Sequence, residues 1–338
     1  MGWDVIGHEW AADLLAEHVA CEQERHAYLF IGPPGVGRRT LALRFAQALN
    51  CSRPPAPGQP CRTCSSCTRI ERMQHPDLFV VQAEQEGGIL KVEQIRALQH
   101  SLSLAPYEAR YKIALLLRFQ EANPNAANAL LKTLEEAPLR VILLLTADTL
   151  ESLLPTIVSR CEVVRLRPMP IHRLAECLRQ TAMLDTEDSS LLAHISAGRL
   201  GIARQMLSDP TILGNRKEWL DDLVRLLGEP RRERFAYAKR ISEDRDTFRQ
   251  VMLTWISYWR DEMICAAGAD TPLVNLDREA ELRQLAETVD LDTARRLVAG
   301  IEAGLERQDA NVNPRLLAEV LTLDWPRVHL TEEVPDEY

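Results

Sequence analysis

Five short apolar runs alternate with helical patterns along the first half of the chain. The runs lie at 27–31, 78–82, 112–117, 140–146 and 162–166. Continuous apolar runs of this length are typical of strands that are buried on both faces of a parallel sheet. Their alternation with helical patterns predicts an α/β fold, in which helices flank a parallel sheet.

After the last apolar run the pattern becomes entirely helical. Pro168 and Pro170 end that run, and residues 171–208 have the pattern of a small helical bundle. The helical pattern continues from 209 onward. Its clearest stripe, at three- and four-residue steps, consists of Phe248, Met252, Trp255, Trp259 and Met263. Such a stripe predicts the core of this last part or an interface with another subunit.

Length and composition favour several domains. A chain of 338 residues is too long for one compact core, and 46% of its residues are hydrophobic. We expect a sheet domain at 1–167, a small helical domain at 168–208 and a larger helical domain at 209–338. No window of about 18 residues is apolar and uncharged, so we expect no membrane span. The net charge of −9 argues against a general nucleic-acid binder, whose surface would be basic.

The first apolar run leads into a glycine-rich turn with the pattern of a phosphate-binding loop. The turn contains Gly32, Gly35 and Gly37, and a helical pattern follows it. In a Walker A motif, this strand–loop–helix context cradles phosphate oxygens with backbone N–H groups, and a Lys followed by Ser or Thr completes it. Arg38 and Arg39 occupy those two positions here. Arg38 keeps a charge but is bulky and planar, and Arg39 offers no hydroxyl to Mg²⁺.

The run at 112–117 lacks the acidic residues of a Walker B motif. Such a strand normally ends in an Asp that holds Mg²⁺ and a Glu that polarises the attacking water. Leu117 and Arg118 stand in those places, and neither can ligate a cation. A misalignment by a residue or two is the alternative, but the nearest carboxylate, Glu121, lies four positions beyond Leu117. We therefore expect no ATP hydrolysis, although the glycine backbone and Arg38 leave weak nucleotide binding open.

Four of the eight cysteines are spaced like the ligands of a structural zinc site. These are Cys51, Cys61, Cys64 and Cys67. Disulfides in a secreted protein are the alternative, but the first residues carry neither the basic nor the apolar part of a signal peptide. Four thiolates leave no open coordination position, so we expect bound Zn²⁺ to be structural. We interpret His75, in the sequence His-Pro-Asp, as part of a turn and not as a fifth ligand.

Further motifs extend along the chain in a fixed order. They are Val5-Ile6-Gly7-His8, Lys91-Val92-Glu93-Gln94-Ile95-Arg96, the string from Asn128 to Pro138, Ser159-Arg160-Cys161, and the segment from Asn313 to Glu319. Together with the glycine-rich turn and the cysteine module at 51–67, they resemble the AAA+ clamp-loader subunits of bacterial DNA polymerase III, and among these the delta-prime family. The resemblance implies a P-loop-type sheet domain with a zinc module, a small helical lid and an all-helical collar that mediates oligomerisation.

The resemblance also bears on individual arginine positions. Arg160 corresponds to the family's arginine finger, which reaches the ATP site of a neighbouring subunit and stabilises charge on the transferring phosphate. A structural ion pair is the alternative role for Arg160. The family's sensor 2 arginine falls on Gly201, and the nearby Arg199 and Arg204 have a different helical phase.

Two charged stretches have a less specific interpretation. Lys132 and Glu135 are expected to be helix-surface or interface residues. The basic residues at 231–234 and 239–240 are interpreted as a solvated helix face, with a DNA-facing patch as the alternative.

The implied function is that of an ATPase-deficient clamp-loader subunit, which helps to load a sliding clamp onto primed DNA in replication. The implied partners are gamma or tau subunits, delta, the clamp and, within the complex, primer–template DNA. The expected cofactor is structural Zn²⁺, and the expected location is the cytoplasm. One alternative is an active gamma/tau-type ATPase, which needs a working phosphate loop. The other is a zinc-dependent nucleic-acid-binding protein, which needs a basic face around the cysteine module.

Overall fold

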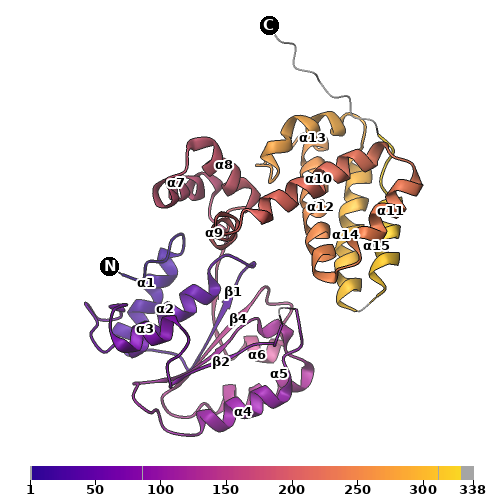
Figure 1. Ribbon diagram of the computed structural model, residues 1–338. Coiled ribbons are helices and arrows are strands. Elements are labelled where there is room, and N and C mark those ends of the chain that lie inside the picture. Colours follow the sequence, from indigo (N-terminus) through magenta and orange to yellow (C-terminus); the bar gives the residue numbers. More distant parts are fainter. Residues whose placement is uncertain (1, 86, 311, 329–338) are drawn as a thin grey trace. The chain divides into compact units, whose positions relative to one another are not determined.

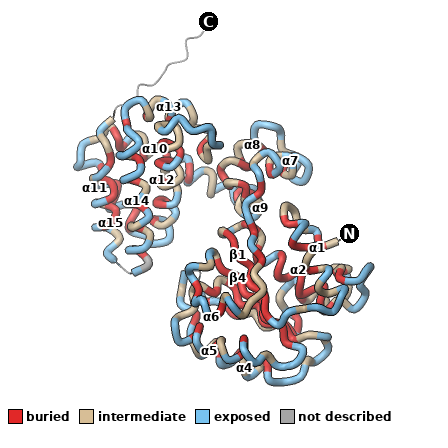
Figure 2. The backbone as a smooth tube through the Cα atoms, turned by 180° about the vertical axis from the view of Figure 1, so that it is seen from behind, coloured by how far each residue is buried: buried red, intermediate tan, exposed pale blue. Residues whose placement is uncertain are grey.

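The computed structural model describes residues 2–85, 87–310 and 312–328. The chain divides into two compact units. The sheet unit contains the residues up to Met169 together with Arg199–Gly201, and the helical unit contains Pro170–Gly198 and the residues from Ile202 onward. Buried residues form separate cores in the two units (Figure 2). The finer division at 167/168 and 208/209 stays a prediction, and residues 329–338 of the expected third domain lie outside the described residues.

A five-stranded parallel sheet forms the centre of the sheet unit, with the strand order β2-β3-β4-β1-β5. The strands are β1 (Ala27–Ile31), β2 (Leu78–Val81), β3 (Lys112–Leu116), β4 (Val141–Ala147) and β5 (Glu162–Arg165). Every residue of β1, β3 and β4 is buried, as expected for strands covered on both faces. The predicted α/β fold with five parallel strands is therefore confirmed, and each strand lies within two residues of its apolar run.

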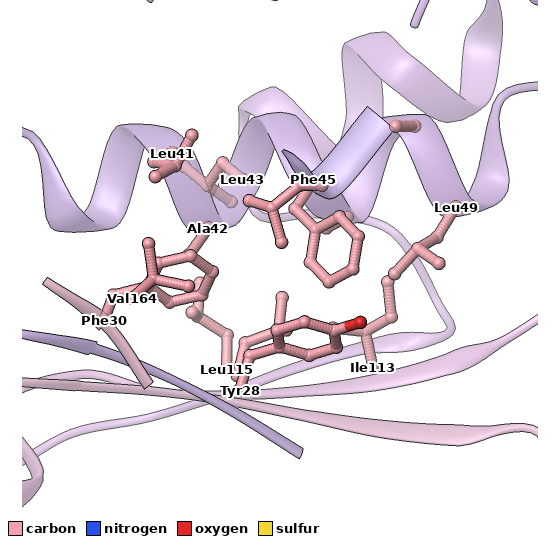
Figure 3. Packing of buried hydrophobic residues seen from close by; sticks show 14 of the residues in the cluster. Tyr28, Phe30, Leu41, Ala42, Leu43, Phe45, Leu49, Ile113, Leu115 and Val164 are labelled. Atoms are coloured by element: carbon pink, nitrogen blue, oxygen red, sulfur yellow. The ribbon is translucent and has the colours of Figure 1, made fainter. Parts of the chain in front are cut away.

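Helices cover both faces of this sheet (Figure 1). On one face lie α1 (Glu9–Ala20), α2 (Arg38–Asn50) and α3 (Ser65–Glu71), and on the other lie α4 (Val92–Leu102), α5 (Pro124–Glu135) and α6 (Pro155–Val158). Each face of the sheet has its own hydrophobic core, and alternate residues of β1 are buried in one core or the other. This is because successive side chains of a strand point to opposite faces. Tyr28 meets the ring of Phe45 from α2 edge-on, with ring centroids 4.6 Å apart (Figure 3).

The helical unit contains α-helices throughout its length. The first are α7 (Ile171–Ala182), α8 (Thr186–Ile195) and α9 (Leu200–Ser208, whose first two residues belong to the sheet unit). They are followed by α10 (Thr211–Gly228), α11 (Arg231–Ile241), α12 (Arg245–Ala266), α13 (Glu279–Ala286), α14 (Leu291–Asp309) and α15 (Pro314–Leu323). Four members of the predicted stripe, Phe248, Met252, Trp255 and Trp259, are fully buried in α12, so the stripe forms a core.

One basic residue departs from the expected solvated face. Arg234 in α11 is buried, and its guanidinium donates hydrogen bonds to five backbone carbonyls near the ends of α10 and α15. Three of those carbonyls lie in the last turns of α10 and α15, where they have no partners within their own helix, and the other two, of Trp325 and Pro326, follow α15. Arg234 is therefore a structural cation, while Arg231, Arg232, Lys239 and Arg240 are exposed as expected. Within the described part of the chain, no helix combines the length and apolar character needed to cross a bilayer.

Candidate functional site

The phosphate loop, residues 32–37, connects β1 to α2 at the carboxyl edge of the sheet. Gly35 and Gly37 have φ angles of +80° and +111°, which residues with a side chain rarely adopt. A Cβ at Gly32 would lie 2.4 Å from the carbonyl oxygen of Leu166, so the chain after β5 packs directly against the loop. The predicted strand–loop–helix context is therefore present in the structure.

The side chain of Arg38 is engaged within the chain. It is nine-tenths buried, and its Nη1 forms an ion pair and hydrogen bond with Oδ1 of Asp148. Asp148 directly follows β4, which pairs with β1, so both residues stand at the same edge of the parallel sheet. Arg39 is exposed, and its Nη2 lies 3.4 Å from Sδ of Met73. The charge of Arg38, at the position where a Walker A lysine would stand, is thus already balanced by a carboxylate.

Backbone groups of the loop are also engaged by other segments of the sheet unit. The N–H of Gly201 donates to the carbonyl oxygen of Gly35 at 2.9 Å. A Cβ at Gly201 would lie 2.6 Å from that same oxygen, so no side chain can stand there. On the other side, Nε2 of His8 donates to the carbonyl oxygen of Val36 at 3.0 Å, and burial lowers the pKa of His8. The position expected for a sensor arginine is therefore a point of close backbone contact.

The end of β3 offers no ligand for a cation. Leu117 is buried, and Arg118 has a left-handed backbone with φ of +49°. Nε of Arg118 donates to Oε1 of Glu121 at 2.8 Å, and the N–H of Gly87 donates to the same oxygen at 2.9 Å. Glu121 lies outside β3, in the short 3₁₀ helix η1 (Phe119–Glu121), as its spacing suggested. The nearest carboxylate is therefore held by an arginine.

The four predicted cysteines come together in one cluster. The sulfur atoms of Cys51, Cys61, Cys64 and Cys67 all lie within 4.8 Å of one another, and none is in a disulfide. Cys51 is the C-cap residue of α2, Cys64 caps the N-terminus of α3, and Cys67 lies inside α3. Three backbone N–H groups donate to cysteine sulfur atoms at 3.3–3.4 Å. They are those of Cys61 to Cys51, Cys64 to Cys61, and Cys67 to Cys64.

This donor set suits a metal ion. Burial opposes ionisation of the Cys64 thiol, but hydrogen bonds from Ser52 and the N–H of Cys67 outweigh it and lower its pKa to about 6. Four sulfur atoms at this spacing match the ligand number and type of a closed tetrahedral site. His75 is absent from the cluster, and its carbonyl accepts from the N–H of Leu78 in a turn before β2, as predicted.

Contacts around the cluster anchor the cysteine module to the rest of the sheet unit. Nε1 of Trp3 donates to the carbonyl oxygen of Gly58 at 3.1 Å, and Arg62 pairs with Asp4 at 2.7 Å. Gly58 has φ of +73°, and a Cβ there would lie 2.1 Å from the carbonyl oxygen of Ala16 in α1. The long loop of the module is therefore fixed against α1 and the N-terminal residues.

Arg160 stands apart from the phosphate loop's contacts, between α6 and β5. Its Nη1 donates to the carbonyl oxygen of Thr156 at 2.8 Å, and its Nη2 donates to Oε1 of Glu135 at 2.6 Å. The side chain of Arg160 is 34% exposed and that of Glu135 is 52% exposed. Glu135 lies on the surface, as expected for it. The guanidinium is thus accessible and held by an exposed carboxylate.

Two partners of these arginines were missed by the sequence analysis. Asp148 carried a usable signal, because it follows the apolar run at 140–146, and parallel strands end at the same edge of a sheet. Glu135 carried none, because its pairing with Arg160 depends on how the end of α5 approaches α6.

Two family models match most of the chain. The model described as "DNA polymerase III, delta subunit" matches residues 7–170, and "DNA polymerase III, delta subunit, C terminal" matches residues 211–327. The DNA polymerase III subunit delta' of Pseudomonas aeruginosa is 39% identical over 163 residues, which are 48% of this chain and 49% of that protein. The gamma subunit of Buchnera aphidicola is 30% identical over 214 residues, or 61% of this chain and 57% of that protein.

The chain spans about half the length of these two curated relatives, the delta' subunit and the gamma subunit. The tau subunit of Bacillus subtilis is 24% identical over 94% of this chain and 60% of its own length. Among solved structures, a gamma-subunit-related protein of Thermotoga maritima covers 94% of this chain and 99% of its own, at 17% identity and a TM-score of 0.46. At that score the structural likeness adds no support. From the family models and the named relatives, the chain belongs to the clamp-loader family of DNA polymerase III subunits.

Proposed function

We propose that this clamp-loader subunit is of the delta-prime type: it hydrolyses no ATP itself and supplies Arg160 to the ATP site of a neighbouring subunit. The pair between Arg38 and Asp148 carries the first half of the proposal. A phosphate entering the loop would have to compete with Asp148 for the guanidinium of Arg38, and the close contact of Gly201 with Gly35 leaves no room for a sensor side chain there. The phosphate would also lack Mg²⁺ ligands, because neither the loop nor the end of β3 supplies a hydroxyl or free carboxylate at the expected positions.

The accessible Arg160 supports the second half of the proposal. An arginine finger needs a guanidinium that can leave its resting contacts and approach a phosphate in another chain. Arg160 is exposed by about a third, and its bonds are to one surface carboxylate, one backbone carbonyl and, at 3.5 Å, the hydroxyl of Ser159, so it meets this need at small cost.

The surrounding assembly follows from this role. We propose that the chain acts with gamma or tau subunits and delta to load a sliding clamp onto primer–template DNA in the cytoplasm. We also propose that Cys51, Cys61, Cys64 and Cys67 hold one Zn²⁺, which cross-links the end of α2 to α3. The metal would have a structural role only, since its four thiolates leave no position for water.

The gamma and tau relatives favour a second candidate, an active ATPase of that type. They align over 61% and 94% of the chain, so similarity alone does not separate the two kinds of subunit. The two candidates differ in one observable property, because an active subunit must bind and hydrolyse ATP in its own phosphate loop.

A reconstituted complex tests the proposal through Arg160. With the Arg160→Ala chain the complex should assemble, and ATP hydrolysis at the neighbouring site and clamp loading should both fall steeply. The isolated variant should fold normally, because an exposed ion pair contributes little stability. Unchanged DNA-dependent turnover and unchanged loading would show that Arg160 is only a structural ion-pair partner.

A further inference from the structure

We infer that Glu135 is a positioning residue for Arg160, which holds the guanidinium at rest and competes with the phosphate for it. The inference rests on the proposed role of Arg160 as a finger. It adds a second residue of this chain to the control of the neighbouring site, through a contact that can be altered without removing the finger.

Two elements restrain the guanidinium from different directions. Within its own segment, Nη1 donates at 2.8 Å to the carbonyl oxygen of Thr156, four residues earlier, and at 3.5 Å to Oγ of the adjacent Ser159. Nη2 is bonded at 2.6 Å to Oε1 of Glu135, which comes from the end of α5. The bonds of Nη1 orient the side chain on its own segment. The bond of Nη2 places a full negative charge beside the atom that would approach a phosphate.

Glu135 has no evident role in stabilising its own helix. It is the last residue of α5, and the C-terminal end of a helix carries partial negative charge that disfavours a carboxylate. Arg160 offsets that repulsion by pairing with it. The contact is therefore favourable for Glu135 only while the guanidinium stays in its resting position.

The strength of the pair suits an exchangeable contact. Both side chains are partly exposed, and exposed pairs of this kind are worth up to about a fivefold change in an equilibrium. A phosphate presents several charged oxygens to the planar guanidinium and forms stronger, charge-assisted hydrogen bonds. Phosphate can therefore displace Glu135, and the carboxylate lowers the apparent affinity of the finger by a small factor. A carboxylate that stayed in place would act in the same direction, by repelling the phosphate.

The test uses the reconstituted complex and the variant Glu135→Gln, which keeps the shape of the side chain and removes its charge. Finger-dependent turnover is defined as the turnover that Arg160→Ala abolishes in the same background. We expect Glu135→Gln to lower the ATP concentration that half-saturates this turnover by about two- to fivefold, with little change in its maximal rate. In the Arg160→Ala background, Glu135→Gln should change neither the residual turnover of the complex nor the ATP concentration that half-saturates it, because the two residues act through one contact.

The neighbouring carboxylate provides the matched control. Glu136 is exposed and follows Glu135 at the end of α5, so Glu136→Gln makes the same change in charge one residue away. It should leave the half-saturating ATP concentration as in the wild type. If the effect of Glu135→Gln persists without Arg160, or equals that of Glu136→Gln, the positioning role is wrong.

This experiment distinguishes loss of the proposed finger role of Arg160 from loss of the positioning role of Glu135. If Arg160→Ala leaves turnover unchanged, the proposed finger is wrong and the role of Glu135 falls with it. If Arg160→Ala lowers turnover while Glu135→Gln leaves the half-saturating concentration unchanged, the finger stands and only the inference about Glu135 is overturned.

Discussion

Arg38 and Arg160 each pair with a carboxylate in the sheet unit, yet they stand in opposite environments. The side chain of Arg38 is 10% exposed, whereas that of Arg160 is 34% exposed. Arg38 is the residue that would serve a nucleotide bound by this chain, and it is enclosed. Arg160 is the residue that would serve a nucleotide bound by another chain, and it is accessible.

The partner alone therefore does not decide the role of an arginine. Removing one partner of a buried ion pair leaves the other charge buried and uncompensated, and this is strongly destabilising. Breaking an exposed pair costs little, because water solvates both groups. A buried pair therefore fixes local structure, while an exposed pair leaves the guanidinium available for another contact.

The largest effect is expected on ATP hydrolysis when Arg160 is replaced, and two variants distinguish the need for its positive charge from the need for its planar guanidinium. At the neighbouring ATP site, Arg160→Ala should lower hydrolysis by about 10³–10⁵, the range found for arginine fingers. Arg160→Lys should restore little of this, because an ammonium group cannot reproduce the planar fork. Single-turnover hydrolysis in the assembled complex measures both, since other sites in the complex should continue to turn over. Full activity of the lysine variant would show that the site needs only a positive charge.

The next effect compares the stability of the two pairs directly. Arg38→Ala should destabilise the sheet unit by about 2 kcal/mol, less than a fully buried pair would lose, because Asp148 is 37% exposed. Arg160→Ala should cost less than ~1 kcal/mol. Hydrogen exchange of the strand amides measures both variants within the sheet unit. Equal losses would contradict the distinction that we draw from burial.

Glu262 extends the comparison to a buried charge without a partner. It is fully buried in α12, neither carboxylate oxygen has a hydrogen-bond partner in the described structure, and burial, with Asp290 nearby, raises its pKa from 4.5 to about 7. The unfolded chain loses this proton first, so its contribution to stability falls as the pH rises from about 4.5 to 7. Glu262→Gln should therefore stabilise the protein above pH 7, by at most ~3 kcal/mol.

Unfolding of the wild type and of Glu262→Gln at pH 8 and at pH 4.5 checks this prediction. The difference between the two proteins should be large at pH 8 and nearly absent at pH 4.5. A difference that does not depend on pH would mean that the carboxylate is not the titrating group.

The smallest effect on the whole unit is expected at the cysteine module. The reduced wild type should contain one Zn²⁺ per chain, and Cys64→Ser should lose it and loosen residues 51–67. Trp3 reports the change, because it donates to Gly58 and stacks near Phe45, so its fluorescence should shift toward that of an exposed indole. Strand amides should stay protected, since the sheet lies outside the module.

Cys21→Ser, at an exposed cysteine outside the cluster, is the matched control and should change neither metal content nor Trp3. Absence of zinc from the wild type, or disulfides among the four cysteines, would end the metal assignment.

The sequence predicted those features that follow from local pattern. Buried strands leave continuous apolar runs, so all five strands were placed, and a fixed cysteine spacing carries its own geometry, so the cluster was found. The phosphate loop could also be predicted from its glycines, because residues with a side chain rarely adopt the backbone angles of this loop.

The sequence could not supply contacts that depend on three-dimensional approach. Arg38 meets Asp148 across 110 positions, and Arg160 meets Glu135 across 25. Arg234 looked like one of several solvated cations, because its sequence neighbours are charged, yet helix packing turns it alone toward carbonyl groups. Gly201 was recognised as a missing arginine, but the reason, a backbone contact with Gly35, is visible only in the fold.

Nucleotide turnover by the isolated chain decides whether its phosphate loop is a working catalytic site. The enclosed Arg38, the contact of Gly201 with the phosphate loop and the missing Mg²⁺ ligands predict no ATP hydrolysis, with or without DNA. Weak binding of nucleotide without turnover is compatible with this account, since the glycine backbone of the loop is retained. Measurable hydrolysis that disappears in Arg38→Ala would contradict it, because the phosphate loop would then be a working catalytic site.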